Sequence, residues 1–122
     1  YVQNEKQYIG VTMGRVANRI RNGRYTLDGV EVNVSKNAGE FILHGGFKGW
    51  SFKVWESEIQ NDALVLTLLS EDGDEGFPGA VIATSIFKLK EDGTLSVEWK
   101  AVTTKATPIN LTNHAYFNLA GH

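Results

Sequence analysis

The sequence predicts an all-β, antiparallel fold. Short alternating or apolar runs recur along the 122 residues, and each run ends at a turn signal. No stretch keeps the spacing of three and four residues that an amphipathic helix needs. The clearest turn signal is Asp28-Gly29, between the runs 25–27 and 30–34, because glycine accepts the positive φ of a two-residue hairpin.

Two further strand pairs are expected. Residues 52–58 and 63–70 flank Gln60-Asn61-Asp62, and residues 80–90 and 94–103 are joined at Glu91-Asp92-Gly93. In the last strand, alternation predicts one face toward a core and the other toward solvent. The core-facing set is Leu95, Val97, Trp99 and Ala101, and the solvent-facing set is Ser96, Glu98 and Lys100.

Composition restricts the possible partners. A hydrophobic content of 42% with 21% charged residues is ordinary for one globular domain. The net charge is −2 and the basic residues are scattered, so we expect no nucleic-acid partner. The longest apolar run, residues 63–69, is far below the ~20 residues of a membrane span, so we expect no membrane partner. No paired histidine spacing predicts a metal site, and no cofactor is expected.

The segment 107–119 is the most informative stretch. Read as a strand, it places Ile109, Leu111, Ala115, Phe117 and Leu119 on one face, with Asn113 as the polar exception. The opposite face carries Asn110, Thr112, His114, Tyr116 and Asn118. Five hydrogen-bonding groups without a formal charge are typical of a sugar site. The alternative for His114 is a core histidine bonded to its strand neighbours.

Three other segments have a functional and a structural interpretation. In the loop 44–50, Gly45 and Gly46 would let a ligand approach His44 while Phe47 and Trp50 supply ring faces for a sugar; the alternative is a histidine that caps local backbone. The segment 14–20 is either part of a site or a surface stretch with solvated arginines. The acidic loop 71–79 lacks the spacing of a calcium loop, which favours a solvated turn.

Taken together, four motifs resemble those of the galactose mutarotase (aldose 1-epimerase) family. They are GRVANRI at 14–20, LHGG at 43–46, DGDEGFPG at 72–79 and TPINLTNHAYFNLAG at 107–121. They occur in the family's order over nearly the whole chain. The resemblance implies an antiparallel β-sandwich, the galactose mutarotase-like supersandwich, that opens the ring of an aldose and recloses it on either face of C1.

The resemblance also implies roles for site residues. Ring opening needs an acid for the ring oxygen and a base for the anomeric hydroxyl. His114 matches the family's general acid, and an imidazole suits that role because its unperturbed pKa is ~6.5. His44 matches a second histidine of the catalytic site, which bonds and orients the sugar. Arg19, with Asn18 beside it, matches a contact to sugar hydroxyls.

One departure from the family pattern matters. In the family the general base is a glutamate downstream of the asparagine-histidine strand, and no glutamate here stands in that motif. We therefore expect residues 1–122 to be a partial domain without its upstream strands and base-bearing part. Such a piece would be inactive by itself and could self-associate through unpaired strand edges. A cytoplasmic location is expected, although no targeting signal can be read.

Three functional hypotheses remain open at this stage. The first is an aldose 1-epimerase acting on a free hexose such as galactose or glucose. The second is a catalytically silent carbohydrate-binding or regulatory module of the same fold. The third, a structural β-domain without a ligand, requires the uncharged face around His114 to be coincidental.

Overall fold

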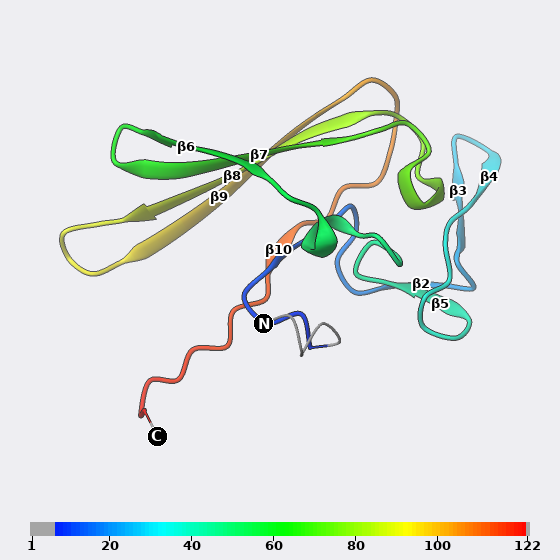
Figure 1. Ribbon diagram of the computed structural model, residues 1–122. Coiled ribbons are helices and arrows are strands. Elements are labelled where there is room, and N and C mark those ends of the chain that lie inside the picture. Colours follow the sequence, from blue (N-terminus) through cyan, green and yellow to red (C-terminus); the bar gives the residue numbers. More distant parts are fainter. Residues whose placement is uncertain (1–6, 122) are drawn as a thin grey trace.

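A computed structural model describes residues 7–121, and its regular elements are almost entirely strands (Figure 1). The strands are β1 (Thr12–Met13), β2 (Arg19–Arg21), β3 (Arg24–Leu27), β4 (Val30–Asn33), β5 (Phe41–Leu43), β6 (Glu56–Gln60), β7 (Ala63–Ser70), β8 (Val81–Leu89), β9 (Leu95–Thr103) and β10 (Thr112–Asn113). Two 3₁₀ turns, η2 (Trp50–Phe52) and η3 (Asp74–Gly76), interrupt them. No α-helix occurs within residues 7–121, which confirms the all-β prediction. None of those residues forms a helix that could cross a membrane.

The strands form one four-stranded sheet and three two-stranded ribbons. The sheet has the order β6-β7-β8-β9, and the ribbons are β1-β10, β2-β5 and β3-β4. All of these pairs are antiparallel. Figure 1 shows the β1-β10 ribbon between the large sheet and the other two ribbons.

The predicted hairpins are present. Leu27 pairs with Val30, and Asp28 and Gly29 have φ values of 49° and 80°, as a primed two-residue turn requires. Gln60 pairs with Ala63 around Asn61 and Asp62. The third hairpin turns between Leu89 and Leu95. The boundary of β6 differs from the expected 52–58, because η2 ends at Phe52 and the strand begins at Glu56.

Two apolar clusters form the core. Trp50, Leu68, Val81 and Ala83 pack on one face of the large sheet under Trp55, Ile109 and Leu111. Val34, Ile42 and Phe77 join the two small ribbons to the loop that contains η3. Ile109 and Leu111, which precede β10, pack against the first cluster, and Val16, which follows β1, packs against the second.

The expected burial along β9 is only partly correct. Val97 and Trp99 are half-buried, but Leu95 and Ala101 are exposed. β9 is an outer strand of the sheet, and the layer of Trp50, Trp55, Ile109 and Leu111 covers the inner strands β7 and β8. Alternation correctly placed Leu95, Val97, Trp99 and Ala101 on one face of β9. It could not show how far across the sheet the covering side chains extend.

The reading of residues 107–119 as one strand is wrong in extent. Only Thr112–Asn113 is a strand, and Ala115, Phe117 and Leu119 are exposed rather than facing a core. Backbone pairing with residues 10–13 holds the segment as far as His114. Beyond it the chain runs away from the sheets (Figure 1), so side-chain alternation there buries nothing.

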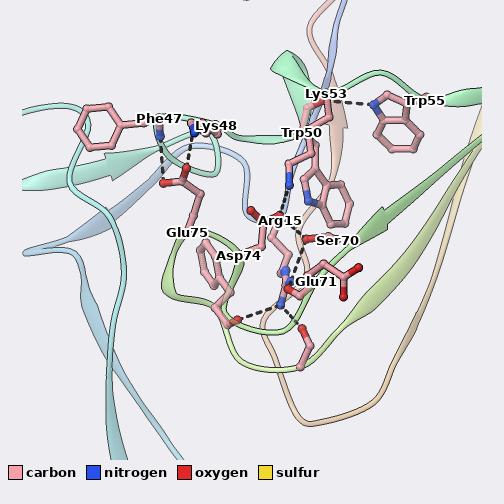
Figure 2. A network of polar contacts seen from close by, with 12 residues as sticks. Arg15, Phe47, Lys48, Trp50, Lys53, Trp55, Ser70, Glu71, Asp74 and Glu75 are labelled. Atoms are coloured by element: carbon pink, nitrogen blue, oxygen red, sulfur yellow. Dashed lines mark hydrogen bonds and ion pairs between the residues drawn. The ribbon is translucent and has the colours of Figure 1, made fainter.

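Arg15 is fully buried, 1% exposed, between the end of β7 and the loop 71–79. Its Nη1 donates to the carbonyl oxygens of Pro78 and Gly79 at 2.8 Å, and its Nη2 donates to Ser70 Oγ at 2.9 Å (Figure 2). The guanidinium therefore connects the acidic loop to the end of β7. The carbonyl of the preceding residue, Gly14, accepts a hydrogen bond from Trp50 N–H.

Candidate functional site

His44 is positioned by the β2-β5 ribbon. Arg19 pairs with Leu43, the last residue of β5, and Asn37 caps that strand end through two hydrogen bonds to Leu43 at 2.7 and 3.0 Å. The chain then turns sharply, because His44 has a φ of 51° and Gly46 N–H donates to the Leu43 carbonyl. The turn places the imidazole of His44 beside Arg19.

His114 is positioned by the β1-β10 ribbon. Its N–H donates to the carbonyl of Val11, and its carbonyl accepts from Gly10 N–H, both at 2.9 Å. These bonds extend the antiparallel pairing of Thr12 with Asn113 by one step. His114 thus stands where the ribbon ends, facing the His44 turn.

The two histidines share one cleft. Their ring centroids lie 5.5 Å apart with the planes at 75°. The cleft has a volume of about 520 Å³, within the usual range for small-molecule sites. Its lining residues are Gln7, Tyr8, Ile9, Arg19, Leu43, His44, His114 and Tyr116.

The proton on His44 is assigned by its neighbour. The backbone N–H of Asn18 donates to His44 Nδ1 at 3.0 Å, so Nδ1 is an acceptor and Nε2 carries the hydrogen of the neutral ring. Burial lowers the pKa of His44 below its ordinary value of 6.5, and it is the largest cause of the shift. The nearby positive charges of His114 and Arg19 lower this pKa further. His44 is therefore a neutral hydrogen-bond donor near pH 7.

The structure brings together Arg19, His44 and His114, which are far apart in sequence. Asn18 does not line the cleft; its backbone holds His44, and its Oδ1 accepts from Arg19 Nη1 at 3.2 Å. This places Asn18 one contact behind the cleft surface.

The aromatic residues expected at the site are not the ones found there. Trp50 is 1% exposed and belongs to the core. Phe47 is exposed to solvent and does not line the cleft. Trp50 is buried because η2 turns its ring onto the sheet beside Leu68 and Val81.

The aromatic side chains that line the cleft are those of Tyr8 and Tyr116, not those of Phe47 and Trp50 in the loop 44–50. Tyr8 lies edge-on to His44 with ring centroids 5.0 Å apart, and Tyr116 lies 5.1 Å from the His114 ring. Burial raises the pKa of the Tyr8 phenol. Tyr116 was on the polar face identified from the sequence, whereas nothing in the sequence around Tyr8 pointed to the site.

Comparison with known proteins assigns the family. The sequence model described as "Aldose 1-epimerase" matches residues 1–122. The chain belongs to the aldose 1-epimerase family. This family member is 45% identical over 120 residues to the aldose 1-epimerase of Escherichia coli K12 and 42% identical over 121 residues to the galactose mutarotase of Bos taurus. These matches cover 98% and 99% of this chain, and it spans 35% of the length of each relative.

Solved structures agree with the family assignment. The GalM/aldose epimerase homologue from C. elegans superposes with a TM-score of 0.90 at 32% identity, over 99% of this chain and 38% of that one. The galactose 1-epimerase from Lactobacillus acidophilus gives 0.85 at 31% identity, over 95% and 36%. The strands of this epimerase-family chain are therefore part of the same antiparallel β-sandwich.

Proposed function

We propose that this chain supplies the sugar-orienting and proton-donating side of a mutarotase site, in which α and β anomers of a free hexose such as galactose or glucose interconvert. The observation that carries the proposal is the shared cleft, where His44 and His114 face each other beside Arg19. The family assignment and the activities for which the relatives are named support the substrate class.

The environments of the two histidines favour different roles. His44 has Nδ1 occupied by Asn18 N–H and a lowered pKa, so it donates a hydrogen bond from Nε2 and is poorly suited to deliver a proton. His114 Nδ1 is buried without a hydrogen-bond partner among the described residues, and the backbone of His114 is fixed on both sides. His114 is therefore the proposed general acid for the ring oxygen, and His44 orients the sugar.

Arg19 and Asn18 complete the proposed binding side. Arg19 lines the cleft and is held by Asn18 Oδ1, so its remaining N–H groups are available to sugar hydroxyls. Tyr8 and Tyr116 offer ring faces or hydroxyls near the two imidazoles. A cytoplasmic location and the absence of other partners stay predictions.

A specific observation favours a second candidate function, a carbohydrate-binding module without catalysis. Among the described residues that line the cleft, none is a carboxylate that could serve as the general base. The family resemblance assigns that base to a glutamate downstream of the asparagine-histidine strand. Binding without turnover is therefore the alternative outcome for this chain.

A hybrid enzyme separates the two functions. This chain replaces the matching segment of the Escherichia coli relative, and polarimetry follows the mutarotation of α-D-galactose. An active hybrid shows that residues of this chain complete a mutarotase site. A folded hybrid that binds galactose but does not mutarotate it supports the binding module, and one that does neither contradicts both functions.

A further inference from the structure

The acidic loop 71–79 is a solvated turn only in part: Glu71 and Asp72 are exposed, but Asp74 and Glu75 are half-buried, and the loop does not contribute to the cleft lining. It contacts the loop that follows His44. The Glu75 carboxylate accepts two backbone hydrogen bonds, from Phe47 N–H to Oε2 at 3.1 Å and from Lys48 N–H to Oε1 at 2.7 Å (Figure 2). One side chain thus binds two successive amides of another loop.

Neighbouring contacts reinforce this connection. Asp74 Oδ2 accepts from Ser70 Oγ and pairs with Lys53 Nζ, each at 2.5 Å. Lys53 directly follows η2, at the other end of the His44 loop. The 3₁₀ turn η3 therefore contacts this loop at two points, through adjacent carboxylates.

Glu75 is held in an unusual backbone conformation. Its φ of 52° and ψ of 20° lie in the left-handed region, which residues other than glycine adopt rarely and at a cost of about 1–3 kcal/mol. Its carbonyl accepts a hydrogen bond from Ser35 N–H at 2.9 Å. The surrounding structure thus fixes the direction in which the carboxylate points.

The two glycines after His44 fit this arrangement. A side chain at Gly46 would overlap the Glu75 carboxylate, and one at Gly45 would overlap the carbonyl of Gly14. The turn is therefore confined between Gly14 and Glu75. Packing does not hold its outer part, because Phe47 is 64% exposed and Lys48 is also exposed. Within residues 7–121, the Glu75 carboxylate is the group that accepts hydrogen bonds from the Phe47 and Lys48 amides.

We propose that Glu75 is a positioning residue for His44: its carboxylate fixes the Phe47 and Lys48 amides, and so holds the His44 turn in the geometry that binds sugar. Glu75 itself lies outside the cleft lining. The significance of this role for sugar binding rests on the proposed function, but the effect on His44 can be measured without any sugar.

The variant Glu75→Gln tests the proposal with almost no change in volume. A glutamine presents one oxygen and one NH₂ group, so it can accept from one of the two amides and opposes the other. The matched control is Glu71→Gln in the same loop, since the Glu71 side chain is exposed and has no hydrogen bond in the described part of the chain. Far-UV spectra and amide dispersion establish that each variant folds.

The first measurement is nitrogen NMR of the His44 ring in sugar-free protein. We expect the wild type and Glu71→Gln to keep the hydrogen on Nε2 with Nδ1 as acceptor. In Glu75→Gln we expect a mixture of tautomers and a pKa for His44 that moves back toward 6.5. An unchanged His44 ring in folded Glu75→Gln overturns the proposal, whatever the protein does with sugars.

The second measurement is D-galactose titration of the hybrid enzyme carrying the wild-type, Glu71→Gln or Glu75→Gln sequence. We expect the loss of a charge-assisted hydrogen bond in Glu75→Gln to weaken binding by about tenfold or more. If the wild type shows no galactose binding, the proposed function fails and the His44 spectra alone decide the role of Glu75. If Glu75→Gln binds like the wild type, the positioning role is wrong.

A third measurement applies if Glu75→Gln does not fold. In the wild type, the amide hydrogens of Phe47 and Lys48 should exchange slowly with solvent although both residues are exposed, because the Glu75 carboxylate accepts a hydrogen bond from each. Exchange at the rate of free amides would show that the carboxylate does not hold the turn, and the proposal would be overturned.

Discussion

Asn18 and His44 are joined by a reciprocal pair of hydrogen bonds: His44 N–H donates to the Asn18 carbonyl, and Asn18 N–H donates to His44 Nδ1, both at 3.0 Å. The first bond extends the pairing of β2 with β5 by one step, and the second fixes the orientation of the imidazole ring. Protonation of His44 would place a hydrogen on Nδ1 and oppose the second bond.

This relationship predicts a pH dependence of stability. The folded pKa of His44 lies below 6.5, so just below pH 6.5 the unfolded chain binds more protons than the folded chain. The contribution of His44 to stability is therefore full above pH 6.5 and declines as the pH falls from 6.5 through the folded pKa. Urea unfolding across that range should show the decline in the wild type and a smaller one in His44→Gln. Identical pH profiles would contradict the assignment.

His114→Ala should remove catalysis rather than binding. A positioned general acid contributes about 10²- to 10⁴-fold, so in the active hybrid enzyme kcat should fall by at least ~10²-fold. His44→Ala should weaken substrate binding more than it lowers kcat. The isolated chain should mutarotate little above the buffer rate. Polarimetry decides each point: near-wild-type turnover of His114→Ala would remove His114 from the acid role.

Arg15→Met should destabilise the fold strongly. It leaves Ser70 and the Pro78 and Gly79 carbonyls without their buried donor, at an expected cost of at least about 3 kcal/mol in unfolding free energy. The matched control is Arg24→Met, because the Arg24–Glu31 pair is exposed and should contribute less than about 1 kcal/mol. Equal losses in the two variants, measured by denaturant unfolding, would argue against a central role for Arg15.

Gly45→Ala should cost more than Gly29→Ala. Both glycines have positive φ, 88° and 80°, so each substitution introduces strain of about 1–3 kcal/mol. Only at Gly45 does the new methyl group also meet backbone, the carbonyl of Gly14, whereas nothing lies within 4 Å at Gly29. Thermal unfolding of the two variants measures the difference, and equal midpoints would mean that the turn can move away from Gly14.

The outer face of the large sheet should support self-association. Leu69, Ile82 and Val102 are cross-strand neighbours on β7, β8 and β9, and they are 55%, 52% and 72% exposed. β6 and β9 also present strand edges in this sheet. Sedimentation should show concentration-dependent association that Ile82→Lys weakens and Val54→Lys, at a separate exposed position, does not. A monomer at all concentrations would contradict this prediction.

The sequence by itself determined the local structure of this protein. The hairpin at Asp28-Gly29 and the strand pairs around Asn61 and Gly93 follow from turn chemistry and alternation, which act between residues close in sequence. The sequence also determined the family, because four motifs in order specify it, and with it the histidines that line the cleft.

Only the tertiary structure decided which side chains are covered and which ones hold the site in place. Trp50 is drawn into the core, and Ala115, Phe117 and Leu119 stay exposed, because burial depends on a covering layer that alternation does not reveal. Tyr8 contacts His44. Glu75 accepts hydrogen bonds from the Phe47 and Lys48 amides, which are 28 and 27 residues away in the sequence. Such contacts depend on how the ribbons pack, and no local pattern encodes them.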